Sequence, residues 1–358
     1  MGIRVAQWAT GAVGRPQLQE LIEHPGLSLV GVLVYDPEKE GVDAGALCGL
    51  APTTGVLATT SKHAIFALGA DVVLHAASKA YPNETNADDI CRLLAAGTSV
   101  ITTTSYNHLP TYGADLESKF AHACSNGGSR FHAAGENPGF MLERLVMTAT
   151  GLSKHVDRVD LYEATDVSDI ASPRMMFDLM GMGRAPEEVS VDSPIVAKLD
   201  MAYRQALNGA AAVMGIELED IRVAVDTTTL PHDVTVAAGT ISAGTVVGQR
   251  LSWFGRWRGR DFLTIHEEWL ATYDLPQWGL TAPAAGATAP LIRAAIRGIP
   301  NFDLQFNMSW GEVPKGLEGT NAGHLMIGMS AVRAIRHVLA SPPGIVTAPV
   351  FGVLTPRR

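Results

Sequence analysis

A turn near the N-terminus combines glycine spacing with the start of a helix in a way that suits phosphate binding. It follows an apolar run at residues 3–8 and matches the fingerprint G-x-G-x-x-G, except that Ala9 stands at the first glycine. Gly11 would let the backbone approach a pyrophosphate, and Gly14 would let the following helix pack on the strand. An ordinary strand-to-helix turn is the alternative. The residues that we expect to bind a dinucleotide here are Gly11, Ala12, Val13, Gly14 and Arg15.

A second apolar run, residues 27–34, ends at Tyr35 and Asp36 and completes a βαβ unit. Asp36 lies about twenty residues after the glycines, where an acid meets the ribose hydroxyls of NAD and repels the 2′-phosphate of NADP. Arg15 and Lys39 are the nearby cations that could attract such a phosphate. If Asp36 binds the ribose, NAD is preferred; if Tyr35 or Lys39 lines the pocket instead, NADP is preferred.

Side chains that could move a proton follow two later strands. Tyr106 and His108 come after the run 99–104, and Glu136 and Asn137 come after the run 130–134. Hydride transfer needs a proton donor or acceptor beside the nicotinamide, and a histidine titrates in the working range. Asn137 could orient the cofactor amide or the substrate. The alternatives are that Tyr106 and His108 are loop residues and that Glu136 caps the following helix.

Strands and helices alternate through the first 140 residues. We expect strands at 70–78, 99–104 and 130–134 and helices at 87–96 and 113–125. This alternation predicts a doubly wound parallel sheet with its ligands at the carboxyl ends of the strands. Ala77, Ser78 and Thr103 lie at two such ends and are therefore further expected cofactor-binding residues.

The pattern changes after residue 140. A helix at 141–152 is followed by runs with a period of two at 158–164, 234–251 and 261–272, and a helix is expected near 190–214. We therefore expect an α+β domain with a mostly antiparallel sheet, and a helix at 322–340 that returns to the first domain. The expected boundaries are 1–140 for a Rossmann domain, 141–320 for a substrate and dimerisation domain, and 321–358 for the returning helix and tail.

Composition limits the possible partners. The chain has 358 residues, of which 47% are hydrophobic and 18% charged, and its formal net charge is −9. An acidic chain without a Lys/Arg-rich run is not expected to bind nucleic acid, and no apolar stretch is long enough for a membrane span. We expect a cytoplasmic protein. Cys48, Cys91 and Cys124 have no metal-ligand spacing, so no metal site is expected.

Several of these motifs, in this order, resemble the dihydrodipicolinate-reductase-like superfamily, and most closely the 2,4-diaminopentanoate dehydrogenase and native amine dehydrogenase group. They are the first glycine turn, the threonine-rich end at 102–104, the turn 135–140 and the stretch 342–345. The stretches 43–50 and 180–184 also resemble this group. The resemblance implies a Rossmann domain, a second domain that often dimerises, and interconversion of an amine with a carbonyl compound and ammonia. It also implies that NADP is the cofactor, with NAD possible.

The chain departs from this group at one important position. Relatives carry a glutamate just after the threonine-rich strand end, whereas this chain has Ser105 and Tyr106 there. A buried carboxylate is the simplest partner for an ammonium or iminium group, so its absence weakens the amine interpretation. Glu136 is our candidate for its replacement. The paired-histidine and lysine signature of true dihydrodipicolinate reductases is not visible.

Three functions therefore remain open. The first is an oxidoreductase that transfers hydride to or from a C=N group, with Glu136 as the essential carboxylate. The second is a carbonyl or alcohol dehydrogenase in which His108 or Tyr106 donates the proton. The third is a nicotinamide-binding sensor without turnover.

The second domain suggests two further partners. A methionine-rich stretch at 175–182 would suit a small hydrophobic amine or ketone, although it could equally be ordinary core. An aromatic and arginine run at 253–260 favours an oligomer interface, because both residue types are enriched at interfaces. We expect a homodimer.

Overall fold

The computed structural model describes residues 2–78, 84–278, 287–309 and 311–356. The chain divides into two compact units. The first unit comprises 1–141 and 311–349, and the second comprises 142–310 and 350–358. Residues 311–320 thus group with the first unit, where Lys315, Glu318 and Thr320 accept hydrogen bonds from the first helix. The tail 350–358 groups with the second unit, because the backbone N–H of Leu354 donates to Thr150 there.

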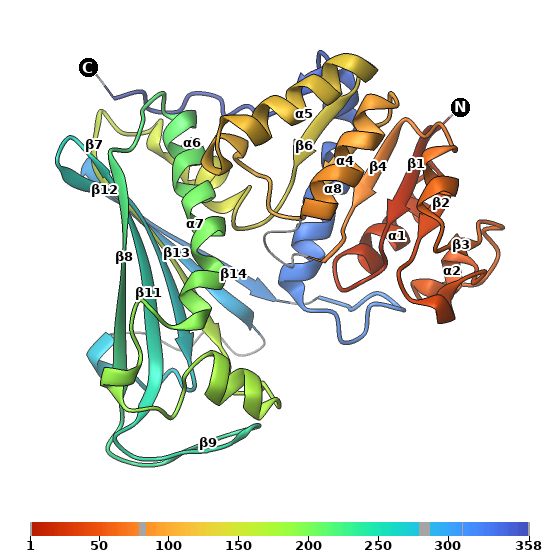
Figure 1. The fold of residues 1–358 in the computed structure, drawn as a ribbon. Coiled ribbons are helices and arrows are strands. Elements are labelled where there is room, and N and C mark those ends of the chain that lie inside the picture. Colours follow the sequence, from red (N-terminus) through yellow and green to blue (C-terminus); the bar gives the residue numbers. More distant parts are fainter. Residues whose placement is uncertain (1, 79–83, 279–286, 310, 357–358) are drawn as a thin grey trace. The chain divides into compact units, whose positions relative to one another are not determined.

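The first unit is built on a parallel sheet of seven strands (Figure 1). Its strands are β1 (Ile3–Trp8), β2 (Leu27–Leu33), β3 (Ala58–Thr59), β4 (Val72–His75), β5 (Ser99–Thr102), β6 (Arg130–Ala133) and β15 (Gly344–Ile345). They are ordered β15-β6-β5-β4-β1-β2-β3, so β1 pairs with both β2 and β4. The strand order therefore reverses beside β1, and ligands bind at such a switch point in open parallel sheets.

Helices cover both faces of this sheet. They are α1 (Gly14–Glu23), α2 (Ala44–Leu47), α3 (Lys62–Phe66), α4 (Glu84–Ala95), α5 (Ala114–Gly127) and α8 (Ala322–Ala340). Residues of α3, α4 and α5 share one buried cluster with the sheet, and residues of α1 and α8 share another. The expected doubly wound fold is confirmed, and α8 returns to the first unit with the bounds expected from the sequence.

The second unit contains a mixed, mostly antiparallel sheet of six strands. They are β7 (His155–Asp166), β8 (Asp220–Thr229), β11 (Val246–Trp257), β12 (Arg260–Leu270), β13 (Ala287–Ile299) and β14 (Phe302–Ser309), in the order β14-β13-β7-β12-β11-β8. Only the β7–β12 pairing is parallel among these neighbours. The expected strand 234–251 was wrong: it is a small hairpin of β9 (Val234–Val236) and β10 (Gly239–Ile241), followed by the start of β11. Gly239 and Gly244 adopt positive φ and break the run.

One face of this sheet packs against α7 (Pro194–Val213) (Figure 1). Tyr203 of α7 packs on Trp253 of β11, whose indole N–H donates to Asp200 of the same helix at 2.9 Å. Trp253 is fully buried and therefore belongs to the core. Our expectation that it lies in an oligomer interface was wrong, because strand alternation turns it toward α7 while Phe254 faces the opposite side.

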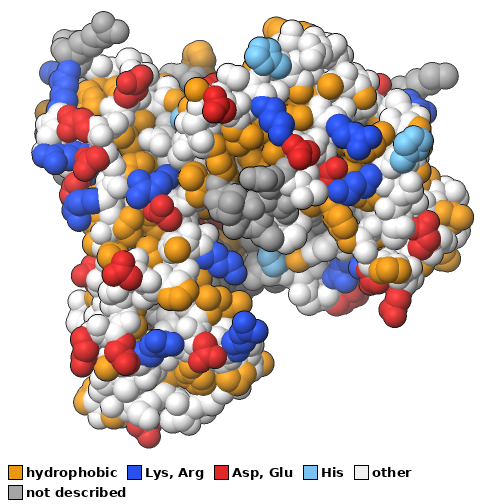
Figure 2. All heavy atoms as spheres, in the orientation of Figure 1, with side chains coloured by type: hydrophobic (Ala, Val, Ile, Leu, Met, Phe, Trp, Pro, Cys, Tyr) orange, Lys and Arg blue, Asp and Glu red, His pale blue; other side chains and the backbone are white. Residues whose placement is uncertain are grey.

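The methionine-rich stretch is mainly core. Met176, Met180 and Met182 are buried in a cluster of the second unit, whereas Met175 is exposed. The chain enters this unit through a π-helix (Met141–Val146) and α6 (Met147–Thr150), which together take the place of the expected helix at 141–152. None of the helices in the described ranges has both the length and the hydropathy that a membrane crossing requires. On the face shown in Figure 2, acidic and basic side chains are interspersed.

Candidate functional site

A cavity of about 480 Å³ lies in the first unit, at the carboxyl ends of β1, β2, β4 and β5. Nine of the residues that we expected to bind a dinucleotide line this cavity: Gly11, Ala12, Val13, Tyr35, Asp36, Lys39, Ala77, Ser78 and Thr103. Ala9, Thr10, Ala76, His324 and Ile327 line it as well. The cavity therefore occupies the switch point beside β1 that the fold predicts for a ligand.

The two glycines of the turn have different surroundings. A Cβ atom built on Gly11 has no neighbour within 4 Å, so this backbone faces open space in the cavity wall. A Cβ atom built on Gly14 would lie 2.1 Å from the carbonyl oxygen of Ala9, so only glycine fits there. At the start of α1 the N–H groups of Arg15 and Gln17 already donate to the carbonyl oxygens of Gly11 and Val13, so the donors that the turn can offer to an anion are the preceding N–H groups, at residues 11–14. The geometry fits a diphosphate.

The edge of the cavity near β2 carries groups suited to a ribose. Asp36 is exposed and begins the 3₁₀ helix η1 (Pro37–Lys39), where its Oδ1 accepts the N–H of Glu38 at 3.0 Å. The hydroxyl of Tyr35 accepts the indole N–H of Trp8 at 2.9 Å. Tyr35, Asp36 and Lys39 all line the cavity, so both alternatives for the cofactor remain chemically possible.

Gly14 and Arg15 are not among the described residues that line the cavity. Gly14 instead allows the close packing under the turn. The guanidinium of Arg15 donates to Thr320 Oγ1 at 2.9 Å and to the carbonyl oxygen of Glu318 at 3.2 Å. Arg15 thus ties α1 to the segment that precedes α8. A direct contact of Arg15 with a phosphate stays a prediction.

His324 and Ile327 were missed by the sequence analysis. Both lie in the first turns of α8, more than 300 positions after the glycine turn. Gly328 on the same helix lets α8 approach closely, since a Cβ there would lie 3.2 Å from the carbonyl oxygen of Val13. The expected return of α8 to the first domain was the available signal. It did not indicate which side chains reach the cavity.

Tyr106 and His108 follow β5 in a tightly held segment. The ring of Tyr106 is buried in the core beside Phe120, at 5.4 Å between ring centroids. His108 contacts Thr111 Oγ1 through Nδ1 at 2.8 Å, and burial lowers the pKa of its imidazole, which favours the neutral form. Ser105 adopts a positive φ of 65°, and its carbonyl accepts the hydroxyl of Tyr112 at 2.6 Å. Such strain is common near active sites.

Glu136 and Asn137 lie in the turn after β6. The Glu136 side chain is buried, and its backbone carbonyl accepts the N–H groups of Phe140 and Met141. A Cβ on Gly139 would lie 2.6 Å from Asn107 Nδ2, so this turn packs directly on the segment after β5. The described residues that line the 480 Å³ cavity do not include Glu136, Asn137, Tyr106 or His108. Their catalytic roles stay predictions.

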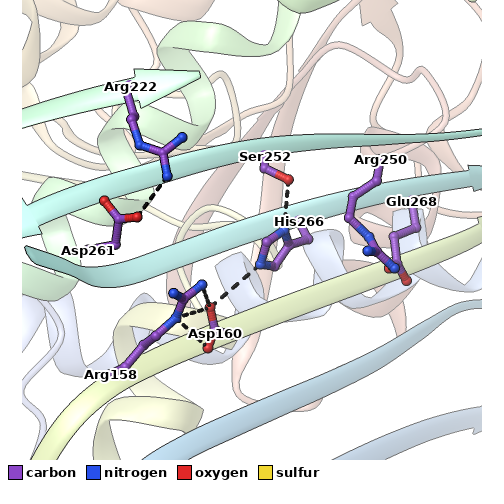
Figure 3. Close-up of polar contacts among 8 residues, drawn as sticks. All are labelled: Arg158, Asp160, Arg222, Arg250, Ser252, Asp261, His266 and Glu268. Carbon is purple, nitrogen blue, oxygen red and sulfur yellow. Dashed lines mark hydrogen bonds and ion pairs between the residues drawn. The ribbon is translucent and has the colours of Figure 1, made fainter. Parts of the chain in front are cut away.

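A second polar cluster lies on the face of the six-stranded sheet opposite α7 (Figure 3). Asp160 accepts the Nε of Arg158 at 2.8 Å and lies 3.5 Å from Nε2 of His266, whose Nδ1 contacts Ser252 Oγ at 2.8 Å. Burial opposes ionisation of Asp160, but the hydrogen bonds from His266 and Arg158 lower its pKa overall. The contacts from Ser252 to His266 and from His266 to Asp160 resemble those of a hydrolytic triad. Ser252 is fully buried, however, and not accessible to a substrate.

Charged pairs extend this cluster along the sheet. Glu268 is fully buried and accepts Arg250 at 2.7 Å and Arg293 at 2.8 Å. Arg222 pairs with Asp261 at 2.7 Å and lies over the ring of Phe254 (Figure 3 shows the pair). We call this set the polar sheet face. Its members are Arg158, Asp160, Arg222, Arg250, Ser252, Phe254, Asp261, His266, Glu268 and Arg293.

Comparison with known proteins gives the following similarities. No family model matches the chain. An amine dehydrogenase from Streptomyces virginiae is 28% identical over 355 residues, which cover 97% of this chain and 95% of that protein. The structure of an amine dehydrogenase from Mycobacterium smegmatis is similar with a TM-score of 0.66, at 19% identity, over 97% of this chain and 95% of the other.

A third similarity concerns the cofactor. GenD2 from gentamicin A biosynthesis, solved in complex with NAD, has a TM-score of 0.51 at 16% identity over 94% of this chain and 85% of the other. The resemblance stated from the sequence is confirmed. The chain is similar along nearly its whole length to an amine dehydrogenase, and it has the fold of Rossmann-type dehydrogenases.

Proposed function

We propose that this protein is an NAD(P)-dependent oxidoreductase that transfers hydride to or from the carbon of a C=N group, as an amine dehydrogenase does. The observation that carries the nicotinamide part is the 480 Å³ cavity at the switch point, in which the open backbone of Gly11 meets Asp36 and Thr103 from neighbouring strand ends. The similarity to an amine dehydrogenase over 97% of the chain supports the amine part.

We assign the following roles to residues of the chain. The backbone of Gly11, Ala12 and Val13 binds the diphosphate, and the edge formed by Tyr35, Asp36 and Lys39 takes the adenosine ribose. The nicotinamide supplies or accepts the hydride. Thr103, at the end of β5, helps to position the ring. The chain must also hold an ammonium or iminium group and take up its proton, for which a buried carboxylate is the simplest partner.

Glu136 is the carboxylate that we propose for this task. It is buried, and a buried carboxylate stabilises a nearby cation more strongly than an exposed one. The turn that carries it packs on the segment after β5, through Gly139 and Asn107. Asn137, the next residue, is our candidate for orienting the carboxamide or the substrate.

The test is the variant Glu136→Gln, with Glu143→Gln as a matched control because Glu143 is also buried. We expect Glu136→Gln to abolish ammonium-dependent oxidation of NADPH or NADH, followed at 340 nm with small hydrophobic ketones and aldehydes. Cofactor binding and the thermal midpoint should be retained. The control should keep its turnover. Amine turnover by Glu136→Gln would contradict the role of Glu136.

A second candidate function has an observation of its own. Burial lowers the pKa of His108, which favours the neutral imidazole, and its contact with Thr111 fixes the ring. A neutral imidazole with a fixed ring can accept the proton of an alcohol during its oxidation, and in the reverse reduction of a ketone the protonated ring is the donor. Reduction of ketones without ammonium, lost in His108→Gln and kept in Glu136→Gln, would favour this carbonyl or alcohol dehydrogenase. Tight cofactor binding without any turnover would favour the sensor.

For the cofactor we propose NADP, with NAD as the alternative. Tyr35 and Lys39 line the cavity, which is the arrangement we associated with NADP, but Asp36 lines it too. The ratio of kcat/KM for NADPH and NADH decides between them. A strong preference for NADH would identify Asp36 as the ribose-binding acid.

We also propose a homodimer that uses the polar sheet face. The carboxylates of this face pair with arginines of the same chain, but the side chains of Arg158 and Arg222 stay 38% and 51% exposed, so a second copy related by a twofold axis can contact these arginines. The test is Arg158→Glu combined with Arg222→Glu, measured by sedimentation velocity, with Arg184→Glu as an exposed control. We expect a dimer in the wild type and the control and a monomer in the double variant. A monomeric wild type would contradict the proposal.

A further inference from the structure

Gln7 is a fully buried amide directly beneath the glycine turn. It lies in β1, and its Nε2 donates to the carbonyl oxygen of Ala9 at 2.9 Å and to Oε1 of Gln17 at 3.0 Å. Gln17 belongs to α1 and is fully buried as well. One side chain therefore connects the strand before the turn, the turn itself and the helix after it.

The carbonyl that Gln7 holds belongs to a residue in an unusual conformation. Ala9 stands at the first glycine of the fingerprint and adopts a positive φ of 74°, a region that favours glycine over alanine. Its carbonyl oxygen also lies against Gly14, where a Cβ would be only 2.1 Å away. Ala9 and Thr10 themselves line the cavity. The direction of this peptide therefore sets how the next residues face a ligand.

The side-chain amides of Gln7 and Gln17 stabilise the fold less than two apolar side chains at these positions would. Within the part of the chain that the structure describes, Gln7 Oε1 and Gln17 Nε2 are buried without a hydrogen-bond partner. A buried polar atom without a partner costs free energy, whereas two apolar side chains of similar size would fill the same space without that cost. Unlike an apolar residue, Gln7 can donate a hydrogen bond to the carbonyl oxygen of Ala9.

We propose that Gln7 is a positioning residue for the diphosphate-binding turn. Its Nε2 holds the Ala9 carbonyl away from the cavity and keeps Ala9 in the left-handed conformation, so that the N–H groups of the turn face the anion. The hydrogen bond from Gln7 Nε2 to Gln17 Oε1 fixes the orientation of the Gln7 side chain. This inference rests on the proposed function, because it requires that the cavity binds a nicotinamide dinucleotide.

The experiment compares Gln7→Met with the wild type and with Gln19→Met. Gln19 is a second buried glutamine of α1, and it donates to the carbonyl oxygens of Lys315 and Cys48 instead of Ala9. Dissociation constants for NADH and NADPH are measured by nicotinamide fluorescence, together with KM, kcat and the thermal midpoint. We expect Gln7→Met to raise the cofactor Kd and KM about tenfold, as expected for a lost hydrogen bond plus a misplaced turn, with kcat little changed. Gln19→Met should bind as the wild type does.

A rescue variant separates positioning from folding. Glycine adopts the left-handed conformation without strain, so Ala9→Gly in the Gln7→Met background should restore most of the affinity. Wild-type affinity in Gln7→Met would overturn the proposal, and so would failure of the double variant to recover affinity or to fold. If the wild type binds neither NADH nor NADPH, the proposed function itself fails, which is a different result.

Discussion

The two glycines of the turn allow cofactor binding to be separated from folding. In Gly11→Ala the added methyl group meets no protein atom within 4 Å, whereas in Gly14→Ala it lies 2.1 Å from the Ala9 carbonyl oxygen and 2.9 Å from its carbon. The first substitution should therefore leave the fold intact and place a methyl group in the cavity. The second should disturb the turn, its helix and the fold together.

The structure gives the size of both effects. Ordinary contact begins near 3.4 Å, so Gly14→Ala requires the turn and helix to separate by the difference from 2.1 Å, which is 1.3 Å. Overpacking of this kind lowers the free energy of unfolding by roughly 1–3 kcal/mol. Gly11→Ala should raise it by about 0.4–1 kcal/mol, because alanine restricts the unfolded chain. A methyl group in the phosphate position should weaken cofactor binding by about 5-fold to 150-fold, the same 1–3 kcal/mol.

The assay is a titration of each variant with NADPH and NADH by fluorescence, alongside urea unfolding without cofactor. We expect Gly11→Ala to unfold at the same or a higher urea concentration and to bind both cofactors more weakly. Gly14→Ala should be impaired in both measurements. Wild-type cofactor affinity in Gly11→Ala would refute the assignment of this turn as the diphosphate site.

Three further predictions concern charge. Asp36→Asn should raise the preference for NADPH over NADH about tenfold, since it removes a carboxylate that repels a 2′-phosphate; Glu38→Gln, an exposed neighbour, should leave the ratio of kcat/KM values unchanged. Glu268→Gln should lower the free energy of unfolding in urea by about 2–3 kcal/mol, because Glu268 is fully buried between two arginines, whereas Asp303→Asn, at a site 73% exposed, should change it by less than about 0.5 kcal/mol. Equal losses of unfolding free energy in Glu268→Gln and Asp303→Asn would contradict a stabilising role of the buried Glu268 between its two arginines. Burial lowers the pKa of His75 to about 3, below the 6.5 of the unfolded chain, so stability should fall with pH below about 6.5 by about 1.4 kcal/mol per unit. Relative to pH 7, the loss at pH 5 should be about 2 kcal/mol larger in the wild type than in His75→Gln, and parallel pH profiles would exclude this role of His75.

The parts of the fold that depend on local patterns could be predicted from the sequence. Helix α8 has the expected bounds, since an apolar helical stripe precedes Ser341 and two prolines. The glycine turn was recognised despite Ala9. The expected strand at 234–251 failed because hydrophobic alternation does not reveal that Gly239 and Gly244 adopt positive φ.

Tertiary packing decided what the sequence could not. Trp253 and Phe254 are adjacent aromatic residues. Trp253 belongs to the core because its side of the sheet is covered by α7, and the sequence does not show which side that is. His324 reaches the cavity from a helix far along the chain, and neither spacing nor composition indicates that contact. The amide of Gln7 reads as a polar interruption of an apolar strand until its partner, the Ala9 carbonyl, is known.

The place of α8 also has a consequence for biosynthesis. The cavity begins at Ala9 but is lined by Ile327 as well, and α8 covers one face of a sheet whose other strands, apart from β15, are made in the first 133 residues. A nascent chain that has emerged only as far as Met141 therefore exposes the apolar face formed by Val5, Val72 and Ile101. The ribosome must complete the whole intervening unit before that face is covered. We expect this interval to be the period in which the chain depends most on chaperones.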